Sequence, residues 1–288
     1  RAKGIGPGKT VLCPAISYLA TAEAIKRTGA TIQFVDVDEN GLMGDIPMMG
    51  LPSAVVYVNL FGNLADYDRL KNYCDKHRIP LIEDAAQSLG SFYKKIPSGK
   101  LGDISSLSFA PSKPLPCFGN GGMVLTDNES ERDFVRGLRY HGSGTAKLHH
   151  GYNSCLSNDH ANVLNFLMSK YKKLLSKTKK VRKLYDEKLF KLGIGSIQTQ
   201  SDTTSNNHKF VIKAQDRDNL KAYLETKNIQ SQVHYALPLS KMKMFHTDEQ
   251  MPNAERFCED VLSLPIHPFL EDYEVIHVCN CIGEFYGV

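Results

Sequence analysis

The stretch SSLSFAPSKPLPCFGNGG, residues 105–122, decides how the rest of the chain is interpreted. Its short apolar run, residues 107–110, predicts the end of a strand. The three prolines that follow exclude a helix, because each lacks an N–H and restricts the residue before it. Lys113, the one lysine of the stretch, is therefore expected on an irregular loop that leaves a strand. The glycines within residues 119–122 allow the backbone to approach a ligand closely.

Lys113 has two interpretations. A lysine amine forms a Schiff base with an aldehyde cofactor once its surroundings lower its pKa from about 10.4. A solvated loop side chain is the commoner case for a lone lysine. The loop by itself does not decide between these two interpretations.

A carboxylate at the end of a second strand favours the first interpretation. Residues 79–87, IPLIEDAAQ, predict a buried parallel strand over residues 80–82 that ends in Glu83 and Asp84. Ligands of open α/β sheets bind beyond the carboxyl ends of the strands. Pyridoxal phosphate needs a carboxylate at its pyridine nitrogen and a lysine at its aldehyde, and Asp84 and Lys113 supply both. If it is considered alone, Asp84 is equally well explained as the N-cap of a following helix.

Predicted strands and helices alternate over the first part of the chain. The predicted strands span residues 11–14, 31–35, 54–60, 80–82, 105–109 and 122–126. The predicted helices span residues 19–28, 65–77 and 129–139, and a long helix follows over residues 158–192. This alternation indicates an α/β fold with a mainly parallel sheet and helices on both faces.

The pattern changes after residue 192. Residues 193–207 are polar and predict a linker or a surface hairpin. Beyond them we expect strands over residues 208–213 and 229–234, and helices over residues 216–226, 253–261 and 271–285. We therefore predict a large domain, residues 1–192, and a smaller C-terminal α+β domain, residues 193–288.

These segments resemble the cofactor-binding core of the DegT/StrS family of sugar-nucleotide aminotransferases, a branch of the fold-type I pyridoxal-phosphate enzymes. The resemblance covers nearly all 288 residues. It is carried in chain order by GIGPGKTVLCPAISYLATAEAIKRTGATIQFVDVD at 4–38, VVYVNLFGNLADYD at 55–68, IPLIEDAAQSLGSFYKK at 79–95, GDISSLSFAPSKPLPCFGNGGMVLTDN at 102–128, LRYHG at 138–142, HHGYNSCL at 149–156, IQSQVHYALPL at 229–239 and FCEDVLSLPIHPFL at 257–270.

The resemblance implies a pyridoxal-phosphate-dependent aminotransferase. Its expected reaction moves an amino group from glutamate to a nucleotide-linked keto-sugar, for polysaccharide or glycan biosynthesis. Lys113 matches the lysine that forms the Schiff base with the cofactor and then moves a proton between cofactor and substrate. Asp84 matches the partner of the pyridine nitrogen, and Gln87 matches the residue beside the ring hydroxyl.

Four further positions match the family pattern. Ser108 matches a phosphate ligand, although a hydroxyl satisfied within its own loop better explains the isolated residue. Tyr18 falls where the family places an aromatic ring stacked on the pyridine ring. An isolated tyrosine is more often a residue of the hydrophobic core. His234 aligns with a residue near the sugar, with a buried structural histidine as an equal alternative. Asn153 matches an asparagine that reaches the partner's cofactor phosphate, which implies a homodimer with shared active sites.

Two departures from the family pattern bear on the phosphate groups. Family members usually begin earlier, with a Gly-Thr turn at a helix N-terminus that holds the phosphate. This chain starts after that turn and has no initiator methionine, so we expect a fragment or a natural truncation with an incomplete phosphate site. The family's common arginine after the asparagine is Cys155 here. An arginine at that place would bind a phosphate-bearing ligand bidentately.

Composition excludes several classes of protein. Hydrophobic residues make up 42% of the chain and charged residues 23%, as in globular proteins with an ample core. The net charge of +4 gives no argument for nucleic acid. No run of about 18 apolar residues indicates a membrane span. Seven scattered cysteines indicate a reduced, cytoplasmic protein without a metal site.

Other functions fit the sequence less well than an aminotransferase. Gly8-Lys9-Thr10 ends like a phosphate-binding P-loop, but Lys3 stands where the first glycine is required. A Rossmann-type oxidoreductase fits the sheet, yet the G-x-G-x-x-G turn after a strand is missing. A related sugar dehydratase would have histidine in place of Lys113. The remaining alternative is a truncated, non-catalytic homologue that binds cofactor or partners weakly.

Overall fold

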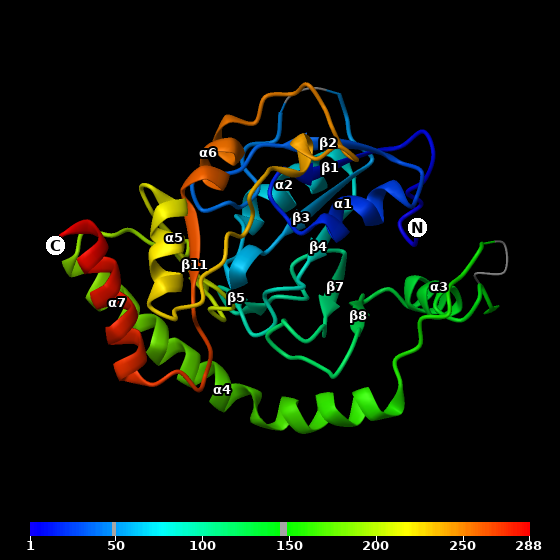
Figure 1. The fold of residues 1–288 in the computed structure, drawn as a ribbon. Coiled ribbons are helices and arrows are strands. Elements are labelled where there is room, and N and C mark those ends of the chain that lie inside the picture. Colours follow the sequence, from blue (N-terminus) through cyan, green and yellow to red (C-terminus); the bar gives the residue numbers. More distant parts are fainter. Residues whose placement is uncertain (48–49, 145–148) are drawn as a thin grey trace.

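The computed structural model describes residues 1–47, 50–144 and 149–288. A six-stranded sheet with the strand order β2-β1-β3-β4-β7-β8 lies at its centre (Figure 1). The strands are β1 (Thr10–Pro14), β2 (Thr31–Val35), β3 (Ala54–Val58), β4 (Leu81–Asp84), β7 (Ile104–Ser108) and β8 (Gly122–Leu125). Neighbouring strands are parallel except for β7 and β8. The predicted α/β fold with a mainly parallel sheet is confirmed.

The central strand β3 is apolar over its whole length. Every residue of β3, AVVYV, is buried, and β-branched residues suit such a strand. The register pairs Val58 of β3 with Asp84 of β4, and Asp84 with Ser106 of β7. The carboxyl ends of these strands therefore meet at one edge of the sheet, where ligands of α/β folds bind.

Three helices follow strands of the sheet: α1 (Leu19–Lys26), α2 (Tyr67–His77) and α3 (Glu129–Leu138). Asp66 and Asn128 are the N-caps of α2 and α3, and each side chain accepts a backbone N–H of the first turn. The strand predicted over residues 54–60 ends two residues early. There the chain turns into the 3₁₀ helix η1 (Leu60–Gly62).

The long helix α4 (Asn158–Lys191) lies along the lower edge of Figure 1 and ends beside α7 (Asp272–Tyr286). Its first half packs through Leu164 and Tyr171 against the buried side chains of the Lys113 loop. Its second half packs into another buried cluster. One helix thus connects the Lys113 loop to the C-terminal part of the chain.

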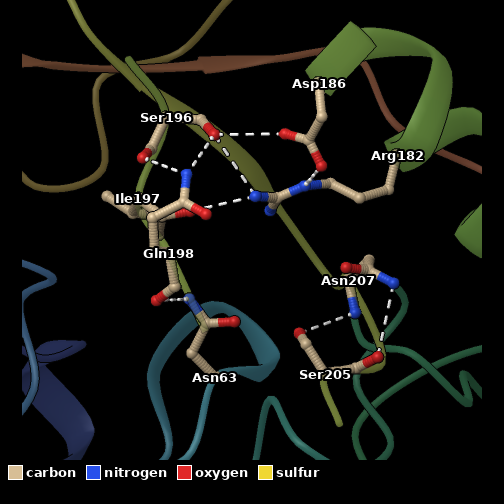
Figure 2. Close-up of polar contacts among 8 residues, drawn as sticks. All are labelled: Asn63, Arg182, Asp186, Ser196, Ile197, Gln198, Ser205 and Asn207. Atoms are coloured by element: carbon tan, nitrogen blue, oxygen red, sulfur yellow. Dashed lines mark hydrogen bonds and ion pairs between the residues drawn. The ribbon is translucent and has the colours of Figure 1, made fainter. Parts of the chain in front are cut away.

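A polar network fixes the segment that follows α4 (Figure 2). The Arg182 guanidinium donates to Asp186 (2.7 Å), to Ser196 Oγ (3.2 Å) and to the carbonyl oxygen of Ile197 (3.0 Å). It also lies 4.7 Å from the ring centroid of Phe210. The predicted linker is therefore attached to the helix before it.

The same linker contains a strand. β9 (Thr203–Thr204) pairs with β5 (Phe92–Tyr93), which also pairs with β6 (Ile96–Pro97). This small sheet joins two segments that are more than a hundred residues apart, so no local sequence signal marks it.

The C-terminal part contains a second small sheet. β10 (Phe210–Lys213) pairs antiparallel with β11 (Val261–Leu264). The other elements there are α5 (Arg217–Thr226), the 3₁₀ helix η3 (Leu239–Lys241) and α6 (Pro252–Asp260).

The prediction of a strand over residues 229–234 is wrong. Of these residues, Gln232 forms a single β-bridge, to Ser263, and the partner of β10 is β11. β11 is completely buried and follows α6 without a break, and the helix predicted over residues 253–261 included only its first residue. The division of the chain at residue 192 stays a prediction.

Candidate active site

A cavity of about 1290 Å³ opens at the carboxyl ends of β4 and β7. It brings together residues that are far apart in the sequence. Six of the seven predicted site residues line it: Tyr18, Asp84, Gln87, Ser108, Lys113 and His234. The seventh, Asn153, is exposed and does not line it, although its neighbours Tyr152 and Ser154 do.

Backbone hydrogen bonds fold the Lys113 loop back on itself. Lys113 donates its backbone N–H to the carbonyl oxygen of Ala110 (2.9 Å), and Phe109 donates to that of Gly121 (2.8 Å). A Cβ on Gly121 would lie 2.9 Å from Cys117 Sγ. This glycine is therefore needed for packing of the loop on itself.

The side chain of Lys113 is half-buried and faces the cavity. Its Nζ lies 5.9 Å from the ring centroid of Tyr18. Burial lowers the pKa of Lys113, and the negative charge of Asp84 opposes that shift. Lys113 is therefore no freely solvated loop residue. A lowered pKa increases the fraction of neutral amine, which is the nucleophilic form.

Two donors orient the carboxylate of Asp84, the last residue of β4. Thr21 Oγ1 donates to Oδ2 (2.7 Å), and the backbone N–H of Ala86 donates to Oδ1 (3.1 Å). The Thr21 hydroxyl is in turn 2.7 Å from Ser17 Oγ. The chain forms turns after Asp84, so the explanation of Asp84 as a helix N-cap is wrong. Thr21 was missed, and the four-residue spacing of Ser17 and Thr21 was the only available signal.

Glu83 anchors the end of β4 from the opposite side. Its side chain is fully buried, and successive strand residues point to opposite faces, so Glu83 points away from Asp84. It accepts hydrogen bonds from Asn59 Nδ2, Ser98 Oγ, Gly99 N, Leu101 N and Ser105 Oγ, at 2.7 to 3.0 Å. This network fixes the strand end that carries Asp84.

Gln87 is held at both ends of its amide. Its Oε1 accepts the backbone N–H of Phe61 (2.7 Å), and its Nε2 donates to the Tyr235 hydroxyl (3.1 Å). Burial raises the pKa of Tyr235 to about 12, so this hydroxyl stays protonated at neutral pH. The two bonds give Gln87 one fixed orientation in the cavity wall.

Tyr18 and Ser108 line the same cavity as Lys113. Tyr18 precedes α1 and is 55% exposed, so its explanation as a core tyrosine is wrong. Ser108 Oγ accepts the backbone N–H of Ala110 (3.4 Å) and also lines the cavity. Both explanations of Ser108 therefore remain open.

The C-terminal part of the chain contributes two histidines and a lysine to the cavity wall: His208, Lys209 and His234. His234 Nδ1 lies 2.9 Å from Ser263 Oγ, and burial, then the charges of Lys209 and Lys113, lower the pKa of His234 to about 4. Burial lowers the pKa of His208 well below its usual value. Both imidazoles are thus neutral at pH 7. His208 and Lys209 were not among the predicted site residues. The only feature of the sequence that pointed to them was their place at the start of a predicted strand.

Asn153 and Cys155 do not line the cavity. The backbone of Asn153 forms a β-bridge to Tyr140, and its side chain is exposed. Cys155 is also exposed, and its Sγ is 3.9 Å from the carbonyl oxygen of Arg139.

The site combines an amine with a lowered pKa, an oriented carboxylate and neutral imidazoles. Such a set can bind an aldehyde covalently and move protons at a neighbouring carbon.

Comparisons with known proteins agree with this chemistry. A model of the DegT/DnrJ/EryC1/StrS aminotransferase family matches residues 1–283. A UDP-2-acetamido-2-deoxy-3-oxo-D-glucuronate aminotransferase of Pseudomonas aeruginosa is 31% identical, over 98% of this chain and 80% of the relative. A UDP-N-acetyl-3-dehydro-alpha-D-glucosamine 3-aminotransferase of Acidithiobacillus ferrooxidans is 35% identical, over 98% of this chain and 79% of the relative.

A solved structure shows the same fold. The crystal structure of a DegT DnrJ EryC1 StrS aminotransferase from Brucella abortus superposes with a TM-score of 0.93 at 30% identity. The match covers 99% of this chain and 82% of that chain.

Proposed function

The chain belongs to the DegT/DnrJ/EryC1/StrS aminotransferase family, and on that premise we propose that it is a pyridoxal-phosphate-dependent sugar aminotransferase. It transfers an amino group from glutamate to a nucleotide-linked keto-sugar in glycan biosynthesis. The observation that carries the proposal is that Lys113 and Asp84 line one cavity. Relatives named for UDP-linked oxo-sugars support the substrate class.

The residues of the cavity fit pyridoxal phosphate. The amine of Lys113 has a pKa lowered by burial and faces the same space as the Asp84 carboxylate. The volume of about 1290 Å³ exceeds that of ordinary small-molecule pockets, so a cofactor and a sugar can share it. Lys113, Asp84, Gln87, Ser108 and Tyr18 would hold the cofactor.

When bound, the cofactor supplies an aldehyde for amines and a ring that takes up electrons from the carbon next to the nitrogen. Lys113 would hold the cofactor, and its Nζ would accept and return the proton that is moved in the transfer. The oriented carboxylate of Asp84 would bind the ring nitrogen of the cofactor. Neutral His234 also lines the cavity, where it would lie near the sugar.

The working unit in this proposal is a homodimer with shared active sites. Asn153 lies outside the cavity of its own subunit and is exposed, so it is free to reach a partner. Large apolar side chains are also exposed at the β8 edge of the sheet, on the loop before it and on α4: Phe118, Met123, Val124 and Phe166. A second copy would cover them.

The proposed location is the cytoplasm. All seven cysteines are free, which suits a reducing compartment. No helix in the described part of the chain is long and apolar enough to cross a bilayer.

The test is amino transfer itself. Protein treated with pyridoxal phosphate is given glutamate and a UDP-linked 3-keto-sugar, and mass spectrometry follows the amino-sugar nucleotide and 2-oxoglutarate. We expect both products in equal amounts, and neither with Lys113→Ala. A protein that binds the cofactor but forms neither product would contradict the proposal and favour a non-catalytic homologue.

A further inference from the structure

A second cavity, of about 710 Å³, adjoins the active-site cavity beside β11. Lys209, Gln232 and His234 line both cavities, so they form the wall between them. Gln232 exchanges two backbone hydrogen bonds with Ser263 of β11 (3.0 and 2.8 Å), and His234 Nδ1 is 2.9 Å from Ser263 Oγ. The wall is therefore held in place by the small sheet.

Lys209 brings an uncompensated positive charge to this wall. It is half-buried, and within the described residues its ammonium group forms no ion pair. Burial lowers the pKa of Lys209, and the charge of Lys113 lowers it further, with no carboxylate to oppose the shift. An unpaired cation away from water is costly, and an anion bound there would remove that cost.

The second cavity is suited to an anion beyond Lys209. Lys221 and His267 also line it, and Glu225 is the one acidic residue in its described lining. The lysines of this lining outnumber its acidic residues, so the cavity favours an anion over a cation.

We propose that Lys209 binds an oxyanion of a substrate at the wall where the two cavities meet. The oxyanion is a carboxylate of the amino donor or a phosphate of the nucleotide-linked sugar. This inference rests on the proposed function, in which Lys113 is committed to the cofactor. The neutral imidazoles of His208 and His234 leave Lys209 as the charge that this wall offers to a substrate.

The two sources of the oxyanion differ in size. A donor carboxylate needs only the wall itself, whereas a diphosphate can extend past Lys209 towards Lys221 in the second cavity. Binding of glutarate and of inorganic pyrophosphate therefore tells the sources apart without turnover.

The experiment measures the dissociation constants of both probes by isothermal titration calorimetry on the cofactor-treated protein. Lys209→Met should weaken at least one probe by about 10- to 100-fold, the range for a hydrogen bond to a charged group. Lys209→Arg should restore most of the affinity. The matched control is Lys213→Met at the exposed end of β10, which should bind as the wild type does.

Loss of glutarate affinity alone assigns Lys209 to the donor, and loss of pyrophosphate affinity alone assigns it to the nucleotide-linked sugar. Circular dichroism checks the fold, and Lys209→Gln replaces Lys209→Met if the latter unfolds. Wild-type affinity for both probes in a folded Lys209 variant would overturn the inference.

Failure of the inference is separable from failure of the proposed function. If the Lys209→Met variant transfers amino groups at the wild-type rate and binds both probes normally, the proposed function stands and the anion site is refuted. If the protein shows no aminotransferase activity but its probe binding depends on Lys209, the anion site stands and the proposed function is refuted.

Discussion

Asp84 acts through a carboxylate that a different element holds in place. The hydrogen bond from Thr21 of α1 spans 63 positions of the chain and is buried on the helix side. A hydrogen bond of this kind fixes the position of the acceptor carboxylate. Asp84 and Thr21 should therefore have graded effects on the same step.

Asp84→Asn should slow the glutamate half-reaction by about 100-fold or more, because the charge that stabilises the protonated ring is gone. Thr21→Val should slow it by about tenfold, since it removes one orienting hydrogen bond and keeps the carboxylate. Stopped-flow absorbance of the cofactor measures both rates. Equal rates in Asp84→Asn and the wild type would make Asp84 only a turn residue.

The site residues that the sequence revealed differ physically from those that it did not. Lys113 and Asp84 stand at strand ends marked by prolines, glycines and an apolar run, so local sequence places them. Thr21, Lys209 and His208 reach the cavity through packing between distant segments. Such contacts leave no mark in the sequence around each residue.

At the scale of elements, β4 is the strand whose position matters most to the site. Its Glu83 carboxylate is surrounded by donors from η1's neighbour Asn59, from residues 98–101 and from β7. Buried carboxylates that are fully hydrogen-bonded hold segments together, and a mismatched donor at such a place is costly.

Glu83→Gln should lower the free energy of unfolding by about 3 kcal/mol, because the new amide donor faces other donors. The matched control is Glu129→Gln at the start of α3, where the side chain is 84% exposed. That change should stay within about 0.5 kcal/mol. Guanidinium unfolding measures both, and equal midpoints for the two variants would rule out a structural role for Glu83.

Most helices and the strands of the central sheet followed local sequence, whereas the small β5-β6-β9 sheet, β11 and the strand expected over residues 229–234 did not. The bounds of α2, α3 and α4 agree with the predicted helices to within two residues. The alternating residues 229–234 looked like a strand, but β10 pairs with β11 instead. Strand pairing depends on burial across the whole domain. Because β11 is completely buried, it pairs with β10 in place of residues 229–234.

At the scale of the whole molecule, the site of one chain is proposed to depend on a second copy. Asn153 is exposed outside its own cavity, beside the exposed rings of Tyr140 and Tyr152. If it donates to the partner's cofactor phosphate, affinity for the cofactor must rise with dimerisation.

Asn153→Ala should lower the affinity for pyridoxal phosphate by about one to two decades. A hydrogen bond to a charged group contributes roughly 1.5–3 kcal/mol, which corresponds to that loss. Asn72→Ala on the exposed face of α2 is the control and should be silent. Analytical ultracentrifugation with cofactor titration gives both the assembly state and the affinity. A monomer that binds as tightly as the dimer would remove the shared site.

The proposed function depends most on Lys113 as the residue that binds pyridoxal phosphate. Borohydride reduction of the cofactor-treated protein, followed by proteolysis and peptide mass spectrometry, tests this role directly. We expect one reduced pyridoxyl group, on Lys113 in the peptide that contains SFAPSK, and none in Lys113→Ala. A reduced group on Lys209 or any other lysine, or an unmodified wild-type protein, would contradict it.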